Sequence, residues 1–239
     1  MNRIAVIDLG TGNLRSVARA LEAAAGEGCE VRVSAAAPDV LRADRVVFPG
    51  QSAIGSVMDR LRGDPALLQA LLRALEAKPF LGICIGLQAL YAHSSEDDGV
   101  QGLDILGGDV RHFLEAGGTD GALIDPVSGR RLKIPHMGWN TVLQNSEQKG
   151  DQEGGGKDGQ AGGHPLWRGI PQDAWFYFVH SYCAIADEPG EVYGTTRYGV
   201  NFAAAAGRAN VFAVQFHPEK SQRNGLALLG NFIRWDGAS

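Results

Sequence analysis

The chain has 239 residues, with 22 Lys and Arg against 27 Asp and Glu and a formal net charge of −5. This length fits one α/β domain, and the acidic balance offers no basic surface to nucleic acid or an anionic membrane, so a small-molecule substrate is expected. No apolar run is long enough to span a bilayer, and the sequence reaches Asp8 too early for a signal peptide, which predicts a cytoplasmic protein. Cys29, Cys84 and Cys183 are far apart, which disfavours a disulfide framework or a metal site.

The first half of the chain alternates short strands with helices. Strands are predicted at residues 3–8, 29–33, 45–48 and 80–83 from their β-rich composition. Leu14, Val17 and Leu21 recur at helical spacing after the first strand, and a second helix is predicted over Pro65–Ala77, opened by Asp64 and Pro65. Strands that alternate with helices indicate a mostly parallel, twisted sheet flanked by helices.

The second half has a different pattern. Residues 174–185 and 192–196 are β-rich with no helix between them, so an antiparallel portion is expected to join the sheet. A last strand at 211–216 precedes a helix that carries Leu226, Leu229 and Ile233. Residues 144–163 are Gly-rich and nearly lack apolar side chains, which predicts a mobile surface loop within a single domain, residues 1–239. No function is assigned to this insertion.

The most informative motif surrounds Cys84, in the run FLGICIGLQ at residues 80–88. A buried strand enters G-x-C-x-G and a helix follows, which is the pattern of a nucleophile elbow with Cys in place of Ser. Flanking glycines permit the tight turn, and the positive end of the helix dipole favours the thiolate that attacks a substrate. The alternative is a buried structural Cys between two packing glycines.

A thiolate nucleophile needs an acid/base partner, and His217 fits best among six histidines. It closes an apolar strand and is followed two residues later by Glu219. Side chains at i and i+2 of an extended backbone share a side, so the carboxylate can orient the imidazole. An ordinary strand-end histidine beside a surface Glu is the alternative. His180 is the rival base, but it lies within a predicted strand with no acid at i+2, which indicates packing or substrate shaping.

Attack on an amide creates an oxyanion that needs backbone N–H donors. The Ile85 N–H and the loop at Gly50 and Gln51 are the predicted donors, although Pro-Gly is also a common simple turn. The run GTGN at residues 10–13 is not a dinucleotide motif, because Arg15 stands where the third glycine belongs. No phosphate-binding loop of the Walker type is present. No cofactor is therefore predicted, and a step that needs ATP or a phosphorylated acceptor belongs on another polypeptide.

These motifs resemble those of the triad-type glutamine amidotransferases. Two further runs, IDLGTGNLRSV at residues 7–17 and KIPHMGWN at 133–140, are similar to the glutaminase subunits of imidazole glycerol phosphate synthase. The resemblance extends from residue 3 to about residue 235 and is interrupted chiefly by the insertion at 144–163. It implies a flavodoxin-like α/β architecture and glutamine as the substrate.

The resemblance also implies roles for individual residues. Cys84 would form a glutamyl thioester, His217 would shuttle the proton, and Glu219 would orient His217. The partner would be a cyclase subunit with a (β/α)-barrel fold, which forms a heterodimer with this chain and receives ammonia for histidine biosynthesis. The residues that would bind the amino-acid end of glutamine are Gln88, Glu96, His180, Ser181 and Tyr182, and those that would face the partner are Asn13, Trp139 and Lys220.

Simpler interpretations exist for the partner-facing residues. Trp139 fits a core aromatic, Lys220 a solvated charge and Asn13 a helix N-cap. The sequence also departs from the family pattern, since Gln51-Ser52 replaces the usual x-Gly after Pro-Gly and Leu9 stands where an aromatic is common. Three other functions remain open from the sequence: an amidotransferase that serves a different product, a catalytically silent regulator of a barrel protein, and a cysteine peptidase.

Overall fold

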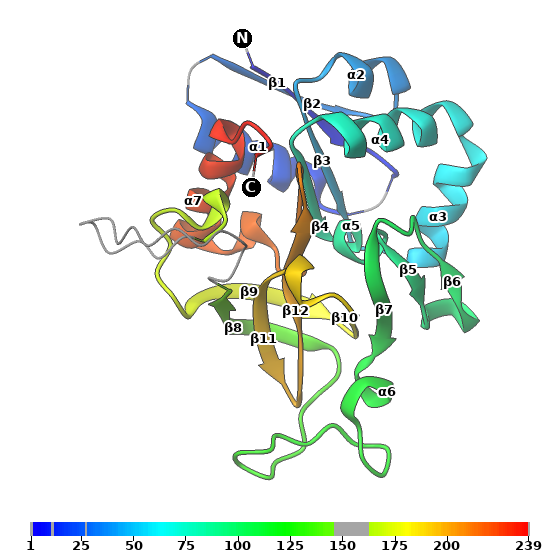
Figure 1. Ribbon diagram of the computed structural model, residues 1–239, viewed down its shortest axis with the longest axis vertical. Helices are drawn as coiled ribbons and strands as arrows, with labels where there is room; N and C mark the ends of the chain where they lie inside the picture. The colour runs from blue at the N-terminus through cyan, green and yellow to red at the C-terminus, as the bar shows by residue number, and fades with distance from the viewer. Residues whose placement is uncertain (1, 11, 27, 146–162, 239) are drawn as a thin grey trace.

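A computed structural model describes residues 2–10, 12–26, 28–145 and 163–238 of the chain. Within these residues, nine strands form one sheet in the order β2-β1-β3-β4-β13-β12-β11-β8-β9, and four form a smaller sheet in the order β10-β7-β5-β6. Figure 1 shows the helices gathered around the half of the large sheet that contains β1 to β4, while the other half is mainly strands.

The strands and helices have the following bounds. The strands are β1 Asn2–Ile7, β2 Cys29–Ser34, β3 Arg45–Gly50, β4 Phe80–Cys84, β5 Tyr91–Ser94, β6 Val100–Gln101, β7 Leu106–His112, β8 His136–Gln144, β9 Ala174–His180, β10 Tyr182–Ala186, β11 Val192–Tyr198, β12 Val200–Arg208 and β13 Val211–Val214. The α-helices are α1 Leu14–Ala25, α2 Ala37–Arg42, α3 Ile54–Gly63, α4 Pro65–Ala77, α5 Ile85–Gln88, α6 Phe113–Gly117 and α7 Gln222–Arg234. Short 3-10 turns are η1 Glu96–Asp98, η2 Pro165–Trp167, η3 Pro189–Glu191 and η4 Pro218–Lys220.

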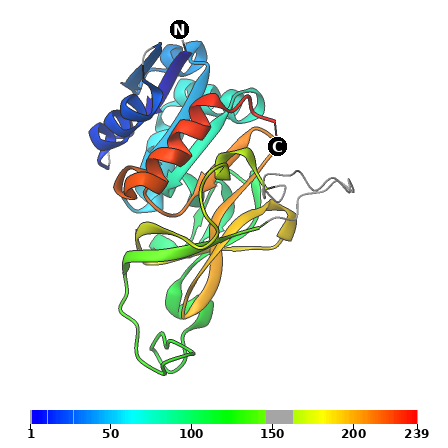
Figure 2. The ribbon, with the colours of Figure 1, turned by 90° about the vertical axis from the view of Figure 1, so that its left-hand side faces the viewer.

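The half of the large sheet made by β2, β1, β3, β4 and β13 is parallel, as the alternation of strands and helices predicts. Helices α1 and α7 pack together on one face, where Val17 and Leu228 belong to one buried cluster. Helices α3 and α4 contribute Leu61 and Leu71 to a second buried cluster. Figure 2 shows α1 and α7 side by side across the sheet. The central parallel strands β1, β3, β4 and β13 are therefore buried on both faces, which explains their nearly continuous apolar sequences, while the edge strand β2 is only partly buried.

The antiparallel portion is as extensive as the parallel one, because β13, β12, β11, β8 and β9 pair in succession as antiparallel neighbours. The predicted β-rich stretch at 174–185 is two strands, which separate at Ser181 and join different sheets. The predicted last strand ends at Val214 rather than at residue 216. Helices α2, α3 and α6 and strands β5, β6, β7, β8 and β12 were not predicted from the sequence.

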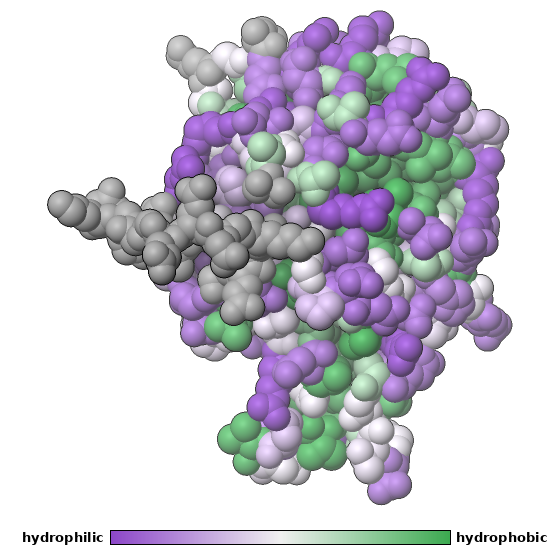
Figure 3. Space-filling model, viewed as in Figure 1, coloured by the Kyte–Doolittle hydropathy of each residue, from purple (hydrophilic) through white to green (hydrophobic). Residues whose placement is uncertain are grey.

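The predicted loop at 144–163 lies mostly outside the described residues. Gln144 is the last residue of β8 and Asn145 donates its backbone N–H to Tyr193 at 3.0 Å, so the strand extends into the predicted loop. Figure 3 shows a largely hydrophilic face, with hydrophobic areas over α3 and α4 and on the loop between α6 and β8, where Val127 is 85% exposed. In the described part of the chain, no helix has both the length and the apolar character needed to cross a membrane.

Lys78 ties helix α2 to the end of helix α4. Its ammonium group donates to the backbone carbonyls of Val40, Leu41 and Ala43 at 3.0, 2.7 and 2.7 Å. The carbonyls at a helix C-terminus have no intrahelical partners, so the cation satisfies them and interacts favourably with the helix dipole. Burial lowers the pKa of Lys78 below its ordinary value. This contact holds the end of α2 against the end of α4.

Candidate active site

Cys84 lies at the end of β4, where the strand turns directly into α5. Its backbone has φ 55° and ψ −103°, a conformation that is strained for a residue with a side chain. A Cβ atom added at Gly86 would lie 1.8 Å from the Phe48 carbonyl oxygen, and one added at Gly82 would lie 2.7 Å from the Gly86 carbonyl oxygen. The two glycines are therefore required for close backbone packing, and the predicted elbow is present.

The neighbouring strands bring the other polar groups to Cys84. In the parallel register, Gly50 of β3 pairs with Cys84, and Val214 of β13 pairs with Ile83. The residues just after β13 therefore lie beside the thiol, at the carboxyl edge of the sheet. Gln215 Nε2 is 3.6 Å from Cys84 Sγ, although the two residues are 131 positions apart in the sequence.

His217 and Glu219 form a buried pair at this edge. His217 Nδ1 donates to Glu219 Oε1 at 2.9 Å, and their side chains are only 2% and 1% exposed. The contact is the predicted one, but the backbone differs from the prediction. His217 stands three residues beyond the end of β13 and Glu219 lies in the 3-10 turn η4, so the turn that Pro218 begins, rather than an extended strand, brings the two side chains together.

The charge state of His217 depends on Cys84 as well as Glu219. Burial is the largest single effect and would lower the pKa of His217, but interaction with Cys84 and with Glu219 outweighs it, so the pKa is raised above its ordinary value. Within the described residues, His217 Nε2 has no partner in good hydrogen-bond geometry. We therefore interpret the contact with Cys84 as a close charge interaction. The protonated imidazole is therefore the favoured form of His217.

The loop after β3 reaches the same histidine. Gln51 Nε2 lies 3.4 Å from His217 Nδ1, and a Cβ at Gly50 would lie 3.2 Å from the Ile85 side chain. Ile85 is the first residue of α5, and the first N–H groups of a helix have no intrahelical partner. The Ser52 hydroxyl, at the position where the sequence departs from the family pattern, is buried without a hydrogen-bond partner in the described structure.

A chain of hydrogen bonds lines the site on the side of β9 and β10. Gln88 Nε2 donates to the Tyr182 carbonyl at 3.1 Å, and His180 Nδ1 contacts the same oxygen at 2.7 Å. A carbonyl only accepts, so His180 carries its proton on Nδ1 and its Nε2 accepts from His136 Nδ1 at 3.1 Å. His136 Nε2 then accepts from Asn140 Nδ2 at 3.3 Å. Both imidazoles are neutral in this network.

The electrostatics of these two histidines agree with the network. Burial lowers the pKa of His136 to about 4. Burial, with a smaller contribution from His136, lowers the pKa of His180 to about 3. Both ring nitrogens of His180 are engaged within the chain, and a neutral group with so low a pKa is a poor acid at neutral pH. His180 is thus held as a neutral side chain between β8 and β10.

Glu96 is the first residue of η1, which follows β5. Its Oε2 accepts from the backbone N–H of Ile54 at 3.0 Å, at the start of α3, and burial raises its pKa. Ser181 is half-buried in the gap between β9 and β10, and its carbonyl accepts from the Phe113 N–H at 3.1 Å. The predicted substrate-binding residues thus come from several elements: Gln88 from α5, Glu96 from η1, His180 from β9 and Tyr182 from β10.

The predicted partner-facing residues Trp139 and Lys220 meet through Tyr177, which was not predicted. Trp139 packs edge-on against the Tyr177 ring with centroids 6.0 Å apart, and Lys220 Nζ lies 5.8 Å from the centre of the same ring. Trp139 is 43% exposed and Trp175 is 55% exposed, so neither is a core aromatic. The outward positions of β9 carry Trp175 and Tyr177 two residues apart, and that alternation was the available signal.

Asn13 stands at the start of α1 and is exposed. Its side chain makes no capping hydrogen bond, so its position does not derive from a side-chain N-cap. A Cβ at the preceding Gly12 would lie 3.3 Å from the backbone nitrogen of Gln51. The loop that carries Asn13 therefore borders the loop after β3.

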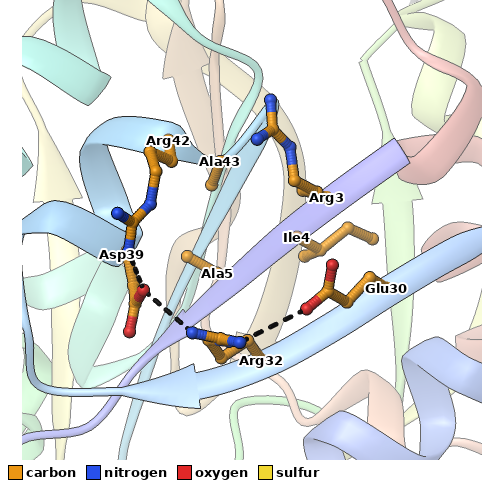
Figure 4. Close-up of a pocket in the computed structure, with 8 residues that line it drawn as sticks. All are labelled: Arg3, Ile4, Ala5, Glu30, Arg32, Asp39, Arg42 and Ala43. Carbon is orange, nitrogen blue, oxygen red and sulfur yellow. Dashed lines mark hydrogen bonds and ion pairs between the residues drawn. The ribbon is translucent and has the colours of Figure 1, made fainter. Parts of the chain in front are cut away.

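A pocket lies between β1, β2 and α2 (Figure 4). Arg32 and Arg42 both contact Asp39, at 3.1 and 2.8 Å, and Arg3 contacts Asp44 at 3.5 Å. The guanidinium groups are thus neutralised by carboxylates of the chain, and we assign no ligand to this pocket. Among the described residues, no three His, Cys, Asp or Glu side chains are grouped to bind a metal ion. Burial raises the pKa of Cys183 to about 12, which leaves it unreactive.

Comparisons with known proteins agree with this geometry. The family described as "Glutamine amidotransferase class-I" matches residues 5–235. Two solved structures share the fold at low identity: PurLQS from Thermotoga maritima, with a TM-score of 0.62, 15% identity and 98% of each chain covered, and the glutaminase domain of CTPS from Trypanosoma brucei with bound acivicin, with a TM-score of 0.58, 14% identity and coverage of 99% and 95%. The chain belongs to the class-I glutamine amidotransferases.

Curated relatives place it more narrowly. It is 46% identical over 236 residues to imidazole glycerol phosphate synthase subunit HisH of Methylococcus capsulatus, covering 99% of this chain and 98% of the relative. It is 48% identical over 239 residues to subunit HisH 1 of Pseudomonas aeruginosa, covering 99% of both. Within its class, the chain belongs to the HisH family.

Proposed function

We propose that Cys84, His217 and Glu219 form the catalytic triad that hydrolyses glutamine to glutamate and ammonia. The observation that carries this proposal is the buried His217–Glu219 pair beside a strained cysteine elbow. Such strain persists only where the surroundings enforce it, and it is concentrated at functional sites. The raised pKa of His217 supports an imidazolium that is ready to protonate a leaving amine.

The reaction follows from these positions. The Cys84 thiolate attacks the carboxamide carbon of glutamine, and His217 gives its proton to the departing ammonia, which leaves a glutamyl thioester. His217 then accepts a proton from water as the water attacks the thioester, and glutamate is released. The Ile85 N–H and the loop at Gly50 and Gln51 stabilise the oxyanion in both steps. Glu219 holds the imidazole and balances its positive charge.

The remaining wall residues recognise the amino-acid end of glutamine. Gln88 donates hydrogen bonds to the Tyr182 carbonyl and to Gln215, whose amide lies beside Cys84, and Glu96, Ser181 and His180 complete this group. A carboxylate such as Glu96 suits the substrate ammonium group. Burial raises the pKa of Glu96 because it disfavours the charged carboxylate. The ammonium group of bound glutamine would favour the charged form again.

The ammonia passes to a cyclase subunit with a (β/α)-barrel fold, in the cytoplasmic pathway of histidine biosynthesis. The names of the relatives support this assignment, because each is called a synthase subunit. The exposed Trp139 and Trp175, with the half-buried Tyr177 and Lys220 beside them, support a docking face next to the site, since aromatic residues are enriched in interfaces. Asn13 extends this face from the side of α1. We also infer a single domain over residues 1–239, because both buried clusters pack on one sheet.

The test is the release of glutamate from glutamine by the purified chain. It is measured alone and with the cyclase subunit plus its ribonucleotide ligand, for wild type, Cys84→Ala and the control Cys29→Ala. We expect low activity alone, a strong rise in the complex, loss in Cys84→Ala and wild-type behaviour in Cys29→Ala, because Cys29 is at the start of β2.

Other results would reject separate parts of the proposal. Hydrolysis that survives in Cys84→Ala would reject the triad. Hydrolysis that the cyclase does not change would leave the triad and reject the partner. A Trp139→Ala variant separates docking from chemistry, since it should weaken binding of the cyclase while the activity of the lone chain is kept.

A further inference from the structure

Gln215 is a buried amide that the triad does not include. It follows β13 directly, is fully buried, and its backbone N–H donates to Ala204 at 2.9 Å. The register of β13 against β4 places it beside Cys84, and its Nε2 lies 3.6 Å from the sulfur. Hydrogen bonds to sulfur are longer than those to oxygen, so this distance fits an N–H donor directed at the thiol.

The direction of the Gln215 amide is fixed by its neighbours. The Tyr182 carbonyl can only accept, so the atom of Gln88 that lies 3.1 Å from it is the amide nitrogen. The second N–H of that nitrogen donates to Gln215 Oε1 at 3.1 Å. Gln215 must then turn its oxygen to Gln88 and its N–H groups to Cys84. The orientation follows from a backbone carbonyl and does not rest on an arbitrary choice between amide atoms.

We propose that Gln215 is a further catalytic group, whose side-chain amide donates a hydrogen bond to Cys84 Sγ and stabilises the thiolate, with Gln88 and the Tyr182 carbonyl holding the amide in place. This inference rests on the proposed role of Cys84 as the nucleophile. A donor with no charge of its own favours the thiolate without competing for the proton that His217 transfers. In a buried site this bond is stronger than in water, and it weakens when the sulfur loses its charge in the thioester.

The arrangement also predicts that the two glutamines act on the sulfur in different ways, Gln215 directly and Gln88 indirectly. Gln88 uses both of its N–H groups on Tyr182 and Gln215, so it acts on the sulfur only through Gln215. Loss of Gln88 should free the Gln215 amide to turn away from the sulfur. In a chain that already lacks Gln215, loss of Gln88 should have no further effect on the sulfur.

The experiment measures the pH dependence of Cys84 alkylation by iodoacetamide, followed by mass spectrometry of the Cys84 peptide. It reads the thiolate directly and needs neither glutamine nor a partner. The variants are Gln215→Met, Gln215→Glu, Gln88→Met and the double variant with both methionines. The control is Gln144→Met, which removes amide bonds to the Ile170 and Pro171 carbonyls far from the site.

We expect Gln215→Met to raise the alkylation midpoint by about one pH unit or more, which is the size expected for losing a hydrogen bond to a charged group. Gln215→Glu should raise it further, because a carboxylate repels the thiolate. Gln88→Met should raise it by a smaller amount, the double variant should not exceed Gln215→Met, and Gln144→Met should match wild type.

An unchanged or lower midpoint in Gln215→Met would overturn the inference while leaving the triad intact. If the Gln215 variants do not fold, Gln88→Met decides: a raised midpoint supports the inference and an unchanged one rejects it. Glutamine hydrolysis that persists in Cys84→Ala would instead reject the nucleophile itself, so the two failures are distinguishable.

Discussion

Three buried histidines make the folded chain sensitive to mild acid. Burial lowers the pKa of His136 to about 4 and that of His164 to about 3, and burial together with a smaller contribution from His136 lowers that of His180 to about 3. In the unfolded chain each returns to about 6.5. A group whose folded pKa is depressed contributes stability above its unfolded pKa and loses it as the pH falls. The loss should therefore run from about pH 6.5 down to the folded values.

The size of the effect follows from linkage. As the pH falls from about 6.5 to 4.5, each histidine should lower the free energy of unfolding by about 1.4 kcal/mol per pH unit. His217 has the opposite sign, because its folded pKa is raised, and its stabilisation is complete below its unfolded pKa. It therefore does not mask the loss in this window.

Urea unfolding at several pH values between 7 and 4.5 measures the slope. His164→Phe is the informative variant, because the ring is enclosed by Tyr193, Phe212 and Trp235 and its Nε2 has no partner in the described structure. The variant should be somewhat less stable at pH 7, because it lacks the acceptor for the Leu166 N–H. The slope of its unfolding free energy against pH should be smaller than that of wild type by about 1.4 kcal/mol per pH unit.

Exposed His93→Gln is the control and should keep the wild-type slope. A wild-type stability that is flat from pH 6.5 to 4.5 would refute the reasoning, as would a His164→Phe slope equal to that of wild type.

Three further predictions concern single contacts. Glu219→Gln keeps the shape of the bonded pair but removes a buried charge. It should lower kcat by about 10²-fold or more and lower the pKa of His217, which NMR titration of the ring measures. An unchanged His217 titration would contradict the assigned pair. Ser52→Ala removes a buried hydroxyl without a partner in the described residues and should raise the free energy of unfolding by about 1 kcal/mol, whereas a loss would show that the hydroxyl is bonded. Lys78→Met should lower the free energy of unfolding by about 1–3 kcal/mol, because the carbonyls at the end of α2 lose their hydrogen-bond donor. Thermal unfolding that matches wild type would show that these bonds do not stabilise the fold.

The sequence predicted the elements that are marked by residues within or beside them, where the surrounding packing favours the same structure. The helix Pro65–Ala77 begins where Asp64 accepts from the Leu67 N–H at 3.0 Å, as the Asp-Pro pair indicates. The elbow at Cys84 was predictable because tight backbone packing excludes side chains at its two glycines. Both signals lie within a few residues of the feature they define.

Strand β12 illustrates what local signals miss. Residues 203–206 are four alanines, which favour a helix, yet they form a central strand between β11 and β13. The environment overrides propensity there, because small side chains fit a strand that is covered on both faces. The break at Ser181 was missed for a similar reason, since the division of one β-rich run between two sheets is decided by distant pairing partners.

The site was predictable only where chemistry marks the residue. Cys84, His217 and Glu219 are chemically distinctive, and their motifs pointed to one another. Gln215 is a neutral amide in a strand-end sequence, and nothing in its neighbours reveals that the register of β13 places it at the sulfur. Tyr177 was missed because its importance lies in joining Trp139 to Lys220, which are far apart in the sequence.

The pairing of β13 with β4 has a consequence for the newborn chain. While a ribosome is still making β12, the cysteine elbow is already translated, but His217 and Glu219 do not yet exist. The thiol therefore lacks its proposed acid/base partner until nearly the whole polypeptide has emerged and its last strand has inserted between β4 and β12. Under the proposed mechanism, chains that end before β13 cannot hydrolyse glutamine, and activity begins only once the sheet is complete.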